Sequence, residues 1–442
     1  MFVVVPGMVQ DAGTGALLAM LAACLVGLAT AFLYAELSSA FPVAGGEYVM
    51  VGKTLGPLPG FVLLVVNMVN NLLFPAVIGL GVSEVLAGVL PDLPVVPTAI
   101  ATVLLATALG VLRIRLNAWV TGIFLAVELL ALAVVCGLGW LAPARPLGEL
   151  LAAPVMTAEH GLLPASLPAI GLATTIGIFA LNGYGLAVYF GEDMRAARTN
   201  IARVILLAFA VTALVELLPL AALLTAAPEL GALFAAPDPF GAFVRQARGD
   251  VLADILAVAI ALAILNAALA GVLAYARFLF ASARDRVWGL LDEPLTRIHP
   301  RFGSPHVATL LVGAAGCLAC LLPLPFLLVL SGAGIAVTYL ALAFAAIAGR
   351  RNRTTAAAAY RMPFFPLAPL VTVVAITLTL GASWLDPATG RPGLVATLVQ
   401  IVLAVLYYRF ILAPRGTWRI YDGAQVGTGG ASNPGQFASE AR

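Results

Sequence analysis

Long apolar segments constrain this chain more than any other feature. An α-helix needs about 20 apolar residues to cross a bilayer, whereas a membrane β-barrel shows strands of about ten residues with alternating hydrophobicity. The chain shows unbroken apolar runs, separated by clusters of Pro, Gly and charged residues. They predict an all-α polytopic membrane protein. The eleven predicted full spans lie near positions 13–40, 58–90, 94–111, 116–142, 162–190, 201–227, 250–283, 305–325, 326–349, 366–386 and 393–413.

The composition excludes several other classes of protein. Of the 442 residues, 10% are charged and 62% are hydrophobic, and the net charge is +2. A soluble domain has roughly one charged residue in four. A disordered chain, a water-soluble enzyme and a nucleic-acid-binding protein are therefore excluded. All four cysteines lie in apolar runs, so we expect no disulfide framework, and we expect Cys317 and Cys320 to pack in a helix rather than bind metal.

The basic residues predict the orientation in the membrane. Nineteen of the 23 Lys and Arg residues fall in one set of loops and in the C-terminal tail, and four fall in the other set. Cytoplasmic loops carry the excess of basic residues. We therefore expect a multi-pass protein of the cell (inner) membrane with its C-terminus in the cytoplasm. Residues 414–442 would form a cytoplasmic tail, disordered in part because it is rich in Gly, Ser and Asn from Tyr421 onward.

The motifs that mark catalysis or phosphate binding do not occur in the sequence. There is no H-E-x-x-H, G-x-S-x-G or phosphate loop, and the three histidines fall in loops or at span ends. This pattern is typical of a carrier rather than an enzyme, and we expect no cofactor and no metal site. The segment Asn182–Gly185 is poor helix sequence in mid-membrane. Unwound backbone at that depth usually lines a cavity; the alternative is close packing of small residues against a neighbouring helix.

Four motifs in register resemble one family. The run Phe179–Tyr184, followed by Gly191-Glu192-Asp193, resembles the sixth span of amino acid–polyamine–organocation (APC) permeases. The runs Tyr34–Tyr48, Asn266–Asp285 and His299–Pro305 look like the second span with its loop, the eighth span and the loop after it. The resemblance covers residues 1 to about 413.

The resemblance implies a LeuT-like (APC) fold in one transporter domain, residues 1–413. Two five-helix repeats of inverted topology would span about 1–142 and 162–349, and two additional helices would span 366–413. The first and sixth spans would be broken, with substrate between the breaks. The chain opens just after the position of the first break, so residues 1–9 would be the outer half of a partial first span whose inner half the chain lacks. The alternative for these residues is a short interfacial segment.

Substrate-binding residues follow from the resemblance and from the predicted break. Asn70 and Asn71 match pocket positions of the family, although hydrogen bonding between helices is an alternative role. The candidate substrate-binding residues are Phe179, Asn182, Gly183, Tyr184, Gly185, Asn70 and Asn71.

Charged residues within the spans suggest coupling and gating roles. A lone carboxylate such as Glu128 in the fifth span is a functional candidate, here for proton coupling; the alternative is a neutral Glu bonded to a backbone carbonyl. The eighth span has no Ser or Thr between Val251 and Ala281, which argues against sodium. Glu36, Glu192 and Arg277 lie near cytoplasmic span ends and are the candidate cytoplasmic gate.

The gate is expected to contain an ion pair. We expect Arg277 to pair with Glu192, or failing that with Glu36; the alternative is that Arg277 extends to the membrane surface. Taken together, the sequence predicts a secondary transporter of an amino acid or related amine, working by alternating access and coupled to protons or exchanging its substrate. Its partners would be this small molecule, the bilayer and no nucleic acid. The alternatives are a membrane enzyme, a channel or an inactive, N-terminally truncated permease.

Overall fold

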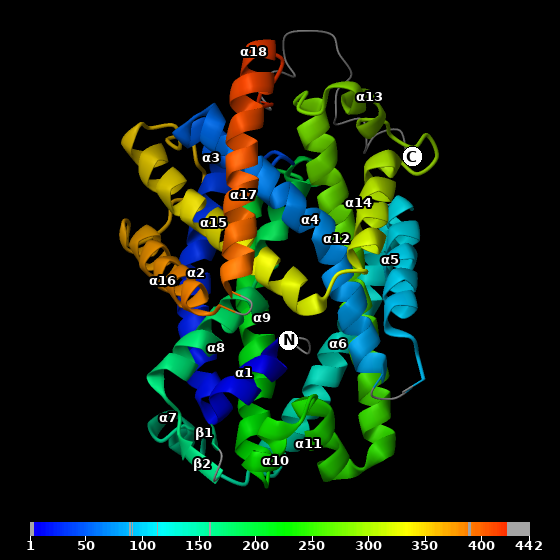
Figure 1. Ribbon diagram of the computed structural model, residues 1–442, viewed down its shortest axis with the longest axis vertical. Coiled ribbons are helices and arrows are strands. Elements are labelled where there is room, and N and C mark those ends of the chain that lie inside the picture. The colour runs from blue at the N-terminus through cyan, green and yellow to red at the C-terminus, as the bar shows by residue number, and fades with distance from the viewer. Residues whose placement is uncertain are drawn as a thin grey trace.

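Long helices running between two ends form the bundle (Figure 1). The computed structural model describes residues 4–87, 90, 92–112, 114–158, 161–387 and 390–421. The long elements are α2 (Ala16–Ala40), α4 (Pro57–Ala87), α5 (Val95–Val111), α6 (Ile114–Leu141), α8 (Leu167–Ala180), α9 (Ala197–Ala226), α12 (Asp250–Arg284), α14 (His306–Ala319), α15 (Leu324–Arg351), α16 (Leu367–Leu385) and α17 (Gly390–Tyr407).

Shorter elements connect these helices or cover their ends. They are α1 (Val5–Ala12), η1 (Gly13–Gly15), α3 (Glu47–Leu55), α7 (Leu147–Ala152), β1 (Val155–Ala158), β2 (Gly161–Pro164), the 3₁₀ helix η2 (Tyr184–Asp193), α10 (Leu230–Ala235), α11 (Pro239–Arg248), η3 (Gly289–Leu291), α13 (Asp292–Leu295), the π-helix η4 (Tyr408–Leu412) and α18 (Ala413–Arg415). The buried α1 packs against α8 and β1.

Every predicted span range contains a helix, but the predicted number of crossings is not confirmed. Within the described residues, nine helical segments are long and apolar enough to cross a membrane. The helices α5 and α14 are shorter, with 17 and 14 residues. The helix α14 ends at Ala319, and Pro323 precedes α15. Proline disfavours a helical conformation at the residue before it, here Leu322, so the two helices do not join. The count of eleven full spans and one partial span stays a prediction.

The described part of the chain is mostly helical, as predicted, and one loop contains a short hairpin that was not predicted. The strands β1 and β2 form an antiparallel hairpin in which Val155 faces Pro164. The side chain of Thr14 receives a 2.8 Å hydrogen bond from the backbone N–H of Val155, which fixes the hairpin on η1. The helix of the predicted span 162–190 therefore begins at Leu167 instead of position 162, because the residues before it pair as a strand.

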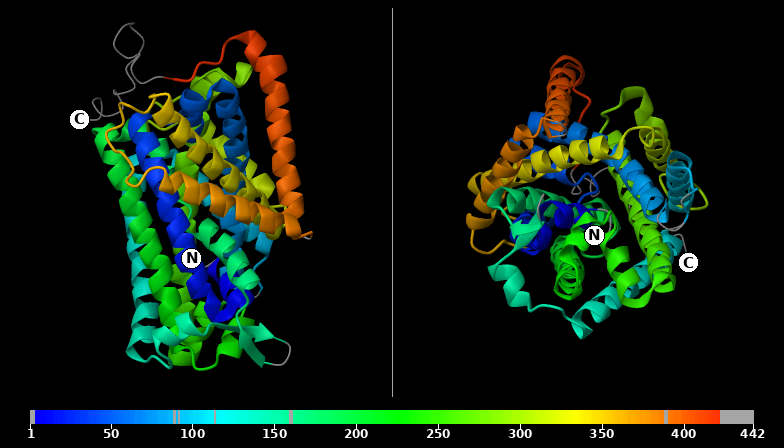
Figure 2. Two further views of the ribbon diagram at one scale, coloured as in Figure 1. Left: turned by 90° about the vertical axis from the view of Figure 1, so that its left-hand side faces the viewer. Right: turned by 60° about the horizontal axis from the view of Figure 1, so that its bottom comes forward.

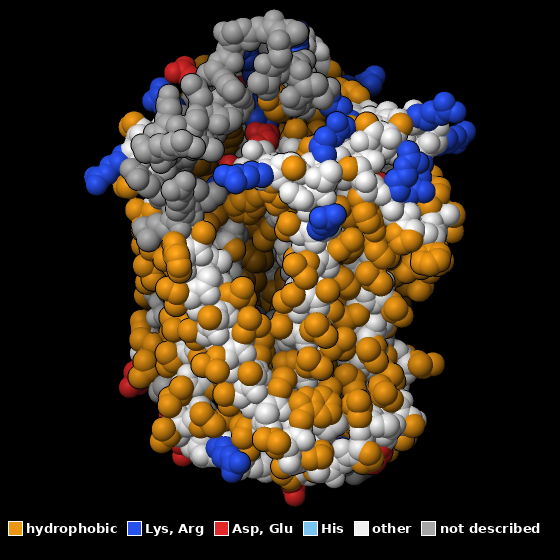
Figure 3. Space-filling model, turned by 180° about the vertical axis from the view of Figure 1, so that it is seen from behind, with side chains coloured by type: hydrophobic (Ala, Val, Ile, Leu, Met, Phe, Trp, Pro, Cys, Tyr) orange, Lys and Arg blue, Asp and Glu red, His pale blue; other side chains and the backbone are white. Residues whose placement is uncertain are grey.

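The outer surface suits a bilayer. Large side chains on the outside are apolar; for example, Leu130, Leu207 and Leu378 are each more than 60% exposed. Figure 3 shows hydrophobic side chains over the middle of one face, with Lys and Arg gathered at one end. We call this the basic end; it is the end where α3, α13 and α18 lie (Figure 1). The helices α16 and α17 lie on the outside of the bundle (Figure 2).

Two predicted segments extend beyond the described part of the chain. The predicted disordered tail falls largely on residues 422–442, and the predicted partial first span includes residues 1–3; both lie outside the described residues. The described part of the tail packs against the bundle. The ring of Trp418 contacts those of Phe61 and Tyr408, with centroids 5.6 and 5.9 Å away.

Candidate functional site

The helix break lies where the sequence predicts it. The helix α8 ends at Ala180, and η2 starts at Tyr184 with the tighter turns of a 3₁₀ helix. Between them, Gly183 has φ +137° and ψ −31°, a conformation that side-chain-bearing residues rarely adopt. The break therefore depends on glycine at this position, and it turns the chain toward the centre of the bundle.

The break borders a central cavity with a volume of about 60 Å³. Its walls come from α2, α3, α4, α8, η2, α12 and α15. Five of the seven candidate substrate-binding residues line it, namely Phe179, Asn182, Gly185, Asn70 and Asn71. Gly183 and Tyr184 do not. The hydroxyl of Tyr184 instead pairs with Thr30 and donates to the hydroxyl of Tyr339, which does line the cavity.

Several polar atoms face this cavity without partners in the described part of the protein. Asn70 Oδ1 and Ser331 Oγ are buried and make no hydrogen bond there. Other polar groups of the wall are held in place: Thr338 donates to Asn67 Oδ1 over 2.7 Å. An unpaired buried polar atom is costly, so these atoms are suited to a ligand that supplies the missing hydrogen bonds.

Sequence reasoning missed an acidic residue in the cavity wall. Glu47, the first residue of α3, is only 4% exposed and lines the cavity. Its Oε1 accepts a 3.0 Å hydrogen bond from the hydroxyl of Tyr34. Burial raises the pKa of this carboxyl. The signal was present in the run Gly45-Gly46-Glu47, since paired glycines before a helix allow a close approach of the backbone.

The predicted pairing of Arg277 is wrong. Arg277 pairs with Asp193 at 2.8 Å, while Glu192 pairs with Arg284 at 2.8 Å. Glu36 is held by Arg350, whose Nε lies 2.7 Å from Glu36 Oε1. Successive residues of a 3₁₀ helix point about 120° apart, so Glu192 and Asp193 reach different arginines.

The structure places Glu128 outside the cavity. It lies on α6, half-buried, and interacts electrostatically with Glu216 of the neighbouring α9. Its role in proton coupling stays a prediction. Among the described residues, no group of three or more His, Cys, Asp or Glu side chains could hold a metal ion.

A second, larger cavity adjoins the central one. It has a volume of about 430 Å³ and lies between α1, α8, α15, α16 and α17. Phe179 and Ile335 line both cavities. The two residues therefore stand between the central cavity and a wide, mainly apolar space.

Comparison with known proteins identifies the family. The family described as amino acid permease matches residues 1–407. The chain belongs to the amino acid permease family. Together with the long apolar helices, this membership makes the protein a multi-pass membrane protein of a transporter family, as the resemblance to APC permeases implies.

Several relatives of this permease carry transporter names. An uncharacterized transporter of Mycobacterium tuberculosis (strain ATCC 25618 / H37Rv) is 30% identical over 312 residues, 69% of this chain and 65% of the relative. The permease therefore spans less than two thirds of that relative's length. The methylthioribose transporter of Bacillus subtilis (strain 168) is 26% identical, and the match covers 83% of this chain and 81% of the relative. The branched-chain amino acid permease BcaP of the same organism is 23% identical, and the match covers 90% of this chain and 86% of the relative.

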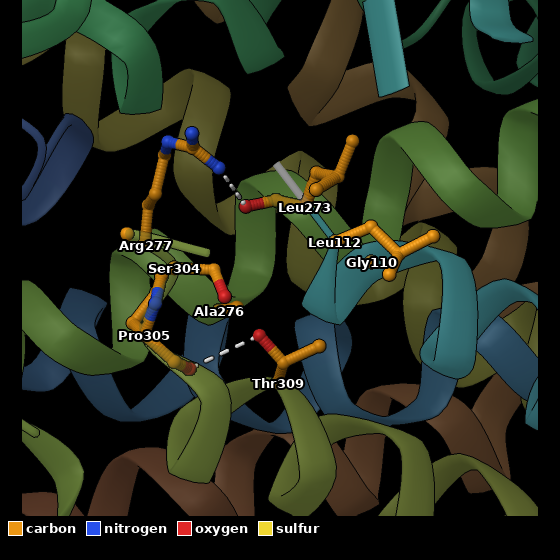
Figure 4. Close-up of a pocket in the computed structure, with 9 residues that line it drawn as sticks. Gly110, Leu112, Leu273, Ala276, Arg277, Ser304, Pro305 and Thr309 are labelled. Atoms are coloured by element: carbon orange, nitrogen blue, oxygen red, sulfur yellow. Dashed lines mark hydrogen bonds between the residues drawn. The ribbon is translucent and has the colours of Figure 1, made fainter. Parts of the chain in front are cut away.

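A small pocket of about 20 Å³ lies between α5, α12 and α14 of the permease (Figure 4). Arg277 is in its wall, but the Nη1 atom already donates to the carbonyl of Leu273 over 3.0 Å. The hydroxyl of Thr309 donates to the carbonyl of Pro305. Since these polar groups are satisfied by the backbone, the pocket offers little to a polar ligand.

Proposed function

We propose that the protein is a secondary active transporter that moves an amino acid or a related amine across the membrane by alternating access. The observation that carries the proposal is the central cavity at the helix break, with its unpaired polar atoms. Broken helices place backbone dipoles beside the substrate in transporters. Relatives named as branched-chain amino acid permeases support an amino acid as the substrate.

The proposed orientation puts the basic end in the cytoplasm of the cell. The excess of Lys and Arg at that end supports it. We further propose two inverted repeats, about 1–142 and 162–349, followed by two additional helices in 366–413. The break in the second repeat supports this arrangement, because the resemblance expects one break in each repeat.

In the proposed cycle, the structure corresponds to a state closed at the basic end. Three arginines there bind carboxylates of other elements, which ties α12 to η2 and α15 to α2. The central cavity and the large apolar space share Phe179 and Ile335 in their walls. Glu36, Glu192 and Arg277 would then act as parts of the cytoplasmic gate through these partners. Movement of the gate would be driven by protons or by exchange of substrate.

Uptake into proteoliposomes tests the proposal. Purified protein is reconstituted, and uptake of L-leucine and of a panel of acidic, basic and neutral amino acids is measured with and without unlabelled amino acid inside. We expect saturable uptake of at least one compound, stimulated by the same compound on the other side. Asn70→Ala should lower it about tenfold, because a ligand bond to a buried amide contributes on the order of 1–2 kcal/mol. Asn200→Ala, outside the cavity, is the matched control.

Other results would overturn the proposal. Non-saturating conductance would indicate a channel, and chemical turnover of a compound in detergent would indicate an enzyme. Absence of uptake for the whole panel would leave an inactive permease as the better interpretation.

A further inference from the structure

The carboxylate of Glu47 is brought into the central cavity by a glycine turn. Gly46 has φ +60°, and a Cβ atom there would lie 2.7 Å from the ring of Tyr189. Only glycine lets the start of α3 approach η2 this closely. The turn therefore places the first side chain of α3, that of Glu47, in the wall beside the helix break.

Tyrosines surround this carboxylate. The titratable groups that face it are Tyr34 of α2, Tyr189 of η2, Tyr275 of α12 and Tyr339 of α15. None of the ion pairs in the described part of the chain includes Glu47. The gate carboxylates differ in this respect, since each of them has an arginine.

A buried carboxylate without a cation is stable only as the neutral acid or with a cationic ligand. Burial raises the pKa of Glu47, and hydrogen bonds from the backbone, from Tyr189 and from Tyr34 offset only part of this shift. The Oε2 atom of Glu47 is buried and accepts no hydrogen bond in the described structure. A group that could bind this oxygen must carry its own proton donor, and the cavity has space for one.

The rest of the wall also favours a cation. Six aromatic rings line the same cavity as Glu47, and the faces of aromatic rings attract ammonium groups. These rings belong to Tyr34, Phe74, Phe179, Tyr189, Tyr275 and Tyr339. A carboxylate inside an aromatic cage is the chemistry that recognises a primary ammonium group.

We propose that Glu47 binds the ammonium group of the substrate and releases a proton when it does so. The neutral acid loses its O–H proton to solvent, and the carboxylate that remains forms an ion pair with the incoming R–NH3⁺. The net charge of the cavity is therefore unchanged, since one proton leaves for each ammonium group that enters. The inference rests on the proposed function. It makes the carrier an exchanger of amine-bearing substrate against protons, with Glu47 as the shared site.

Calorimetry on the purified protein in detergent tests this site without transport. The ligands are isopentylamine, which is leucine without its carboxyl group, and isocaproate, which is leucine without its ammonium group. Titrations in buffers of different ionisation enthalpy count the protons released. Because burial raises the pKa of Glu47, we expect a pH window above the ordinary carboxyl range in which close to one proton leaves per bound isopentylamine. The affinity there should rise up to about tenfold per pH unit. Isocaproate should bind at least tenfold more weakly.

Variants assign the proton to Glu47. Glu47→Gln should bind isopentylamine at least tenfold more weakly, with no proton release and no pH dependence. Glu47→Asp keeps the carboxyl group and should keep the release, which guards against a misfolded Gln variant. Tyr34→Phe removes the hydroxyl donor to Glu47, but this variant should also keep the proton release. Glu84→Gln, a carboxyl on α4 outside the cavity, is the matched control and should behave as the wild type.

Three results would overturn the inference: no binding of isopentylamine by the folded wild type, binding without proton release, or unchanged release in Glu47→Gln. Uptake of amino acids together with any of these would leave the proposed function intact. Conversely, proton-releasing binding of isopentylamine without uptake of any amino acid or of isopentylamine itself would support the site and contradict the transporter.

Discussion

At the residue scale, the helix break depends on a single glycine. A Cβ atom at Gly183 would meet no neighbouring atom within 4 Å, so steric clash does not require glycine here. Glycine is required because the backbone φ is +137°. Gly183→Ala should therefore cost on the order of 1–3 kcal/mol in the broken form. We expect strongly reduced amino acid uptake and a lower unfolding temperature in detergent.

The matched control is Gly171→Ala on α8, the helix that precedes the break, which also has open space at the Cβ position but no unusual φ. Alanine there should be neutral or slightly stabilising, because it favours helix. Equal behaviour of the two variants would contradict the role assigned to the backbone of Gly183.

A second residue-scale prediction concerns Asp285, which follows the last residue of α12. Tyr48 and the backbone N–H of Tyr421 donate hydrogen bonds to its Oδ2 over 2.9 and 3.3 Å. Burial nevertheless raises its pKa from the ordinary value of 3.8 to about 6. The folded state therefore binds this proton more tightly than the unfolded state. The free energy of unfolding should rise as the pH falls from about 6 to about 4, and this contribution should be absent above pH 6.

The measurement is thermal unfolding in detergent across this pH range. Wild type should gain on the order of 1–3 kcal/mol relative to Asp285→Asn on going from pH 7 to pH 4. Glu293→Gln is the control, because Glu293 is an exposed carboxylate with a side chain 85% accessible. A constant difference between wild type and Asp285→Asn would show that Asp285 does not titrate in this range.

The sequence reveals local backbone effects better than it reveals neighbours. Asn182 and Gly183 predict the break because propensity is a local property. Glu47 was missed because hydropathy describes where a span ends, not which loop residue turns back into a cavity. Its proximity to Tyr275 and Tyr339 depends on packing between segments more than 200 residues apart in the chain.

At the element scale, a fork-shaped ion pair ties α2 to α15. Arg350 reaches both oxygens of Glu36, and the backbone N–H of Met362 donates to Oε2 over 2.8 Å. The Glu36 side chain is 2% exposed and that of Arg350 is 21% exposed. Glu36→Gln should destabilise the protein by up to about 3 kcal/mol, because it leaves a partly buried guanidinium without its partner.

Arg350→Lys separates charge from geometry. Lysine keeps the positive charge but cannot bind both oxygens in one plane. We expect Arg350→Lys to lose more than half of the stabilisation measured as the coupling energy between Glu36 and Arg350 in a double-mutant cycle of thermal unfolding. Full retention by lysine would show that charge alone holds α2 to α15.

Sequence reasoning located these elements but not their pairing. The apolar runs predict the position of each helix, since hydropathy follows the chain. The partner of an arginine depends on the rotation of its helix, which the runs do not record. Arg277 therefore has the expected kind of partner, an acid from η2, but the acid is Asp193 and not its neighbour Glu192. The hairpin of β1 and β2 was missed because its strands are only four residues each. Their pairing, like that of the arginines, is not recorded in the hydropathy of the chain.

At the scale of the whole molecule, closure of the basic end and access to the central cavity should be linked. The pairs Arg277–Asp193 and Arg284–Glu192 join α12 to η2, the element that continues from the helix break. When a mutation removes contacts that are present in only one of two states, the equilibrium shifts toward the other state. Removing both pairs should therefore favour opening at the basic end, even though no residue of the cavity wall has been changed.

Thiol labelling measures this shift. Ser331, in the cavity wall, is replaced by cysteine after Cys24, Cys136, Cys317 and Cys320 are replaced by alanine. A membrane-impermeant maleimide is then applied to either side of sealed vesicles. In the variant with Asp193→Asn and Glu192→Gln, labelling from the basic end should rise relative to the opposite side. A change on the order of tenfold corresponds to about 1.4 kcal/mol of lost ion pairing.

Glu293→Gln, which removes only the exposed pair with Arg297, should leave the ratio unchanged. An unchanged ratio in the double variant would mean that these pairs hold η2 in place without controlling access, and apolar packing around Phe278 and Tyr48 would then have to close the basic end.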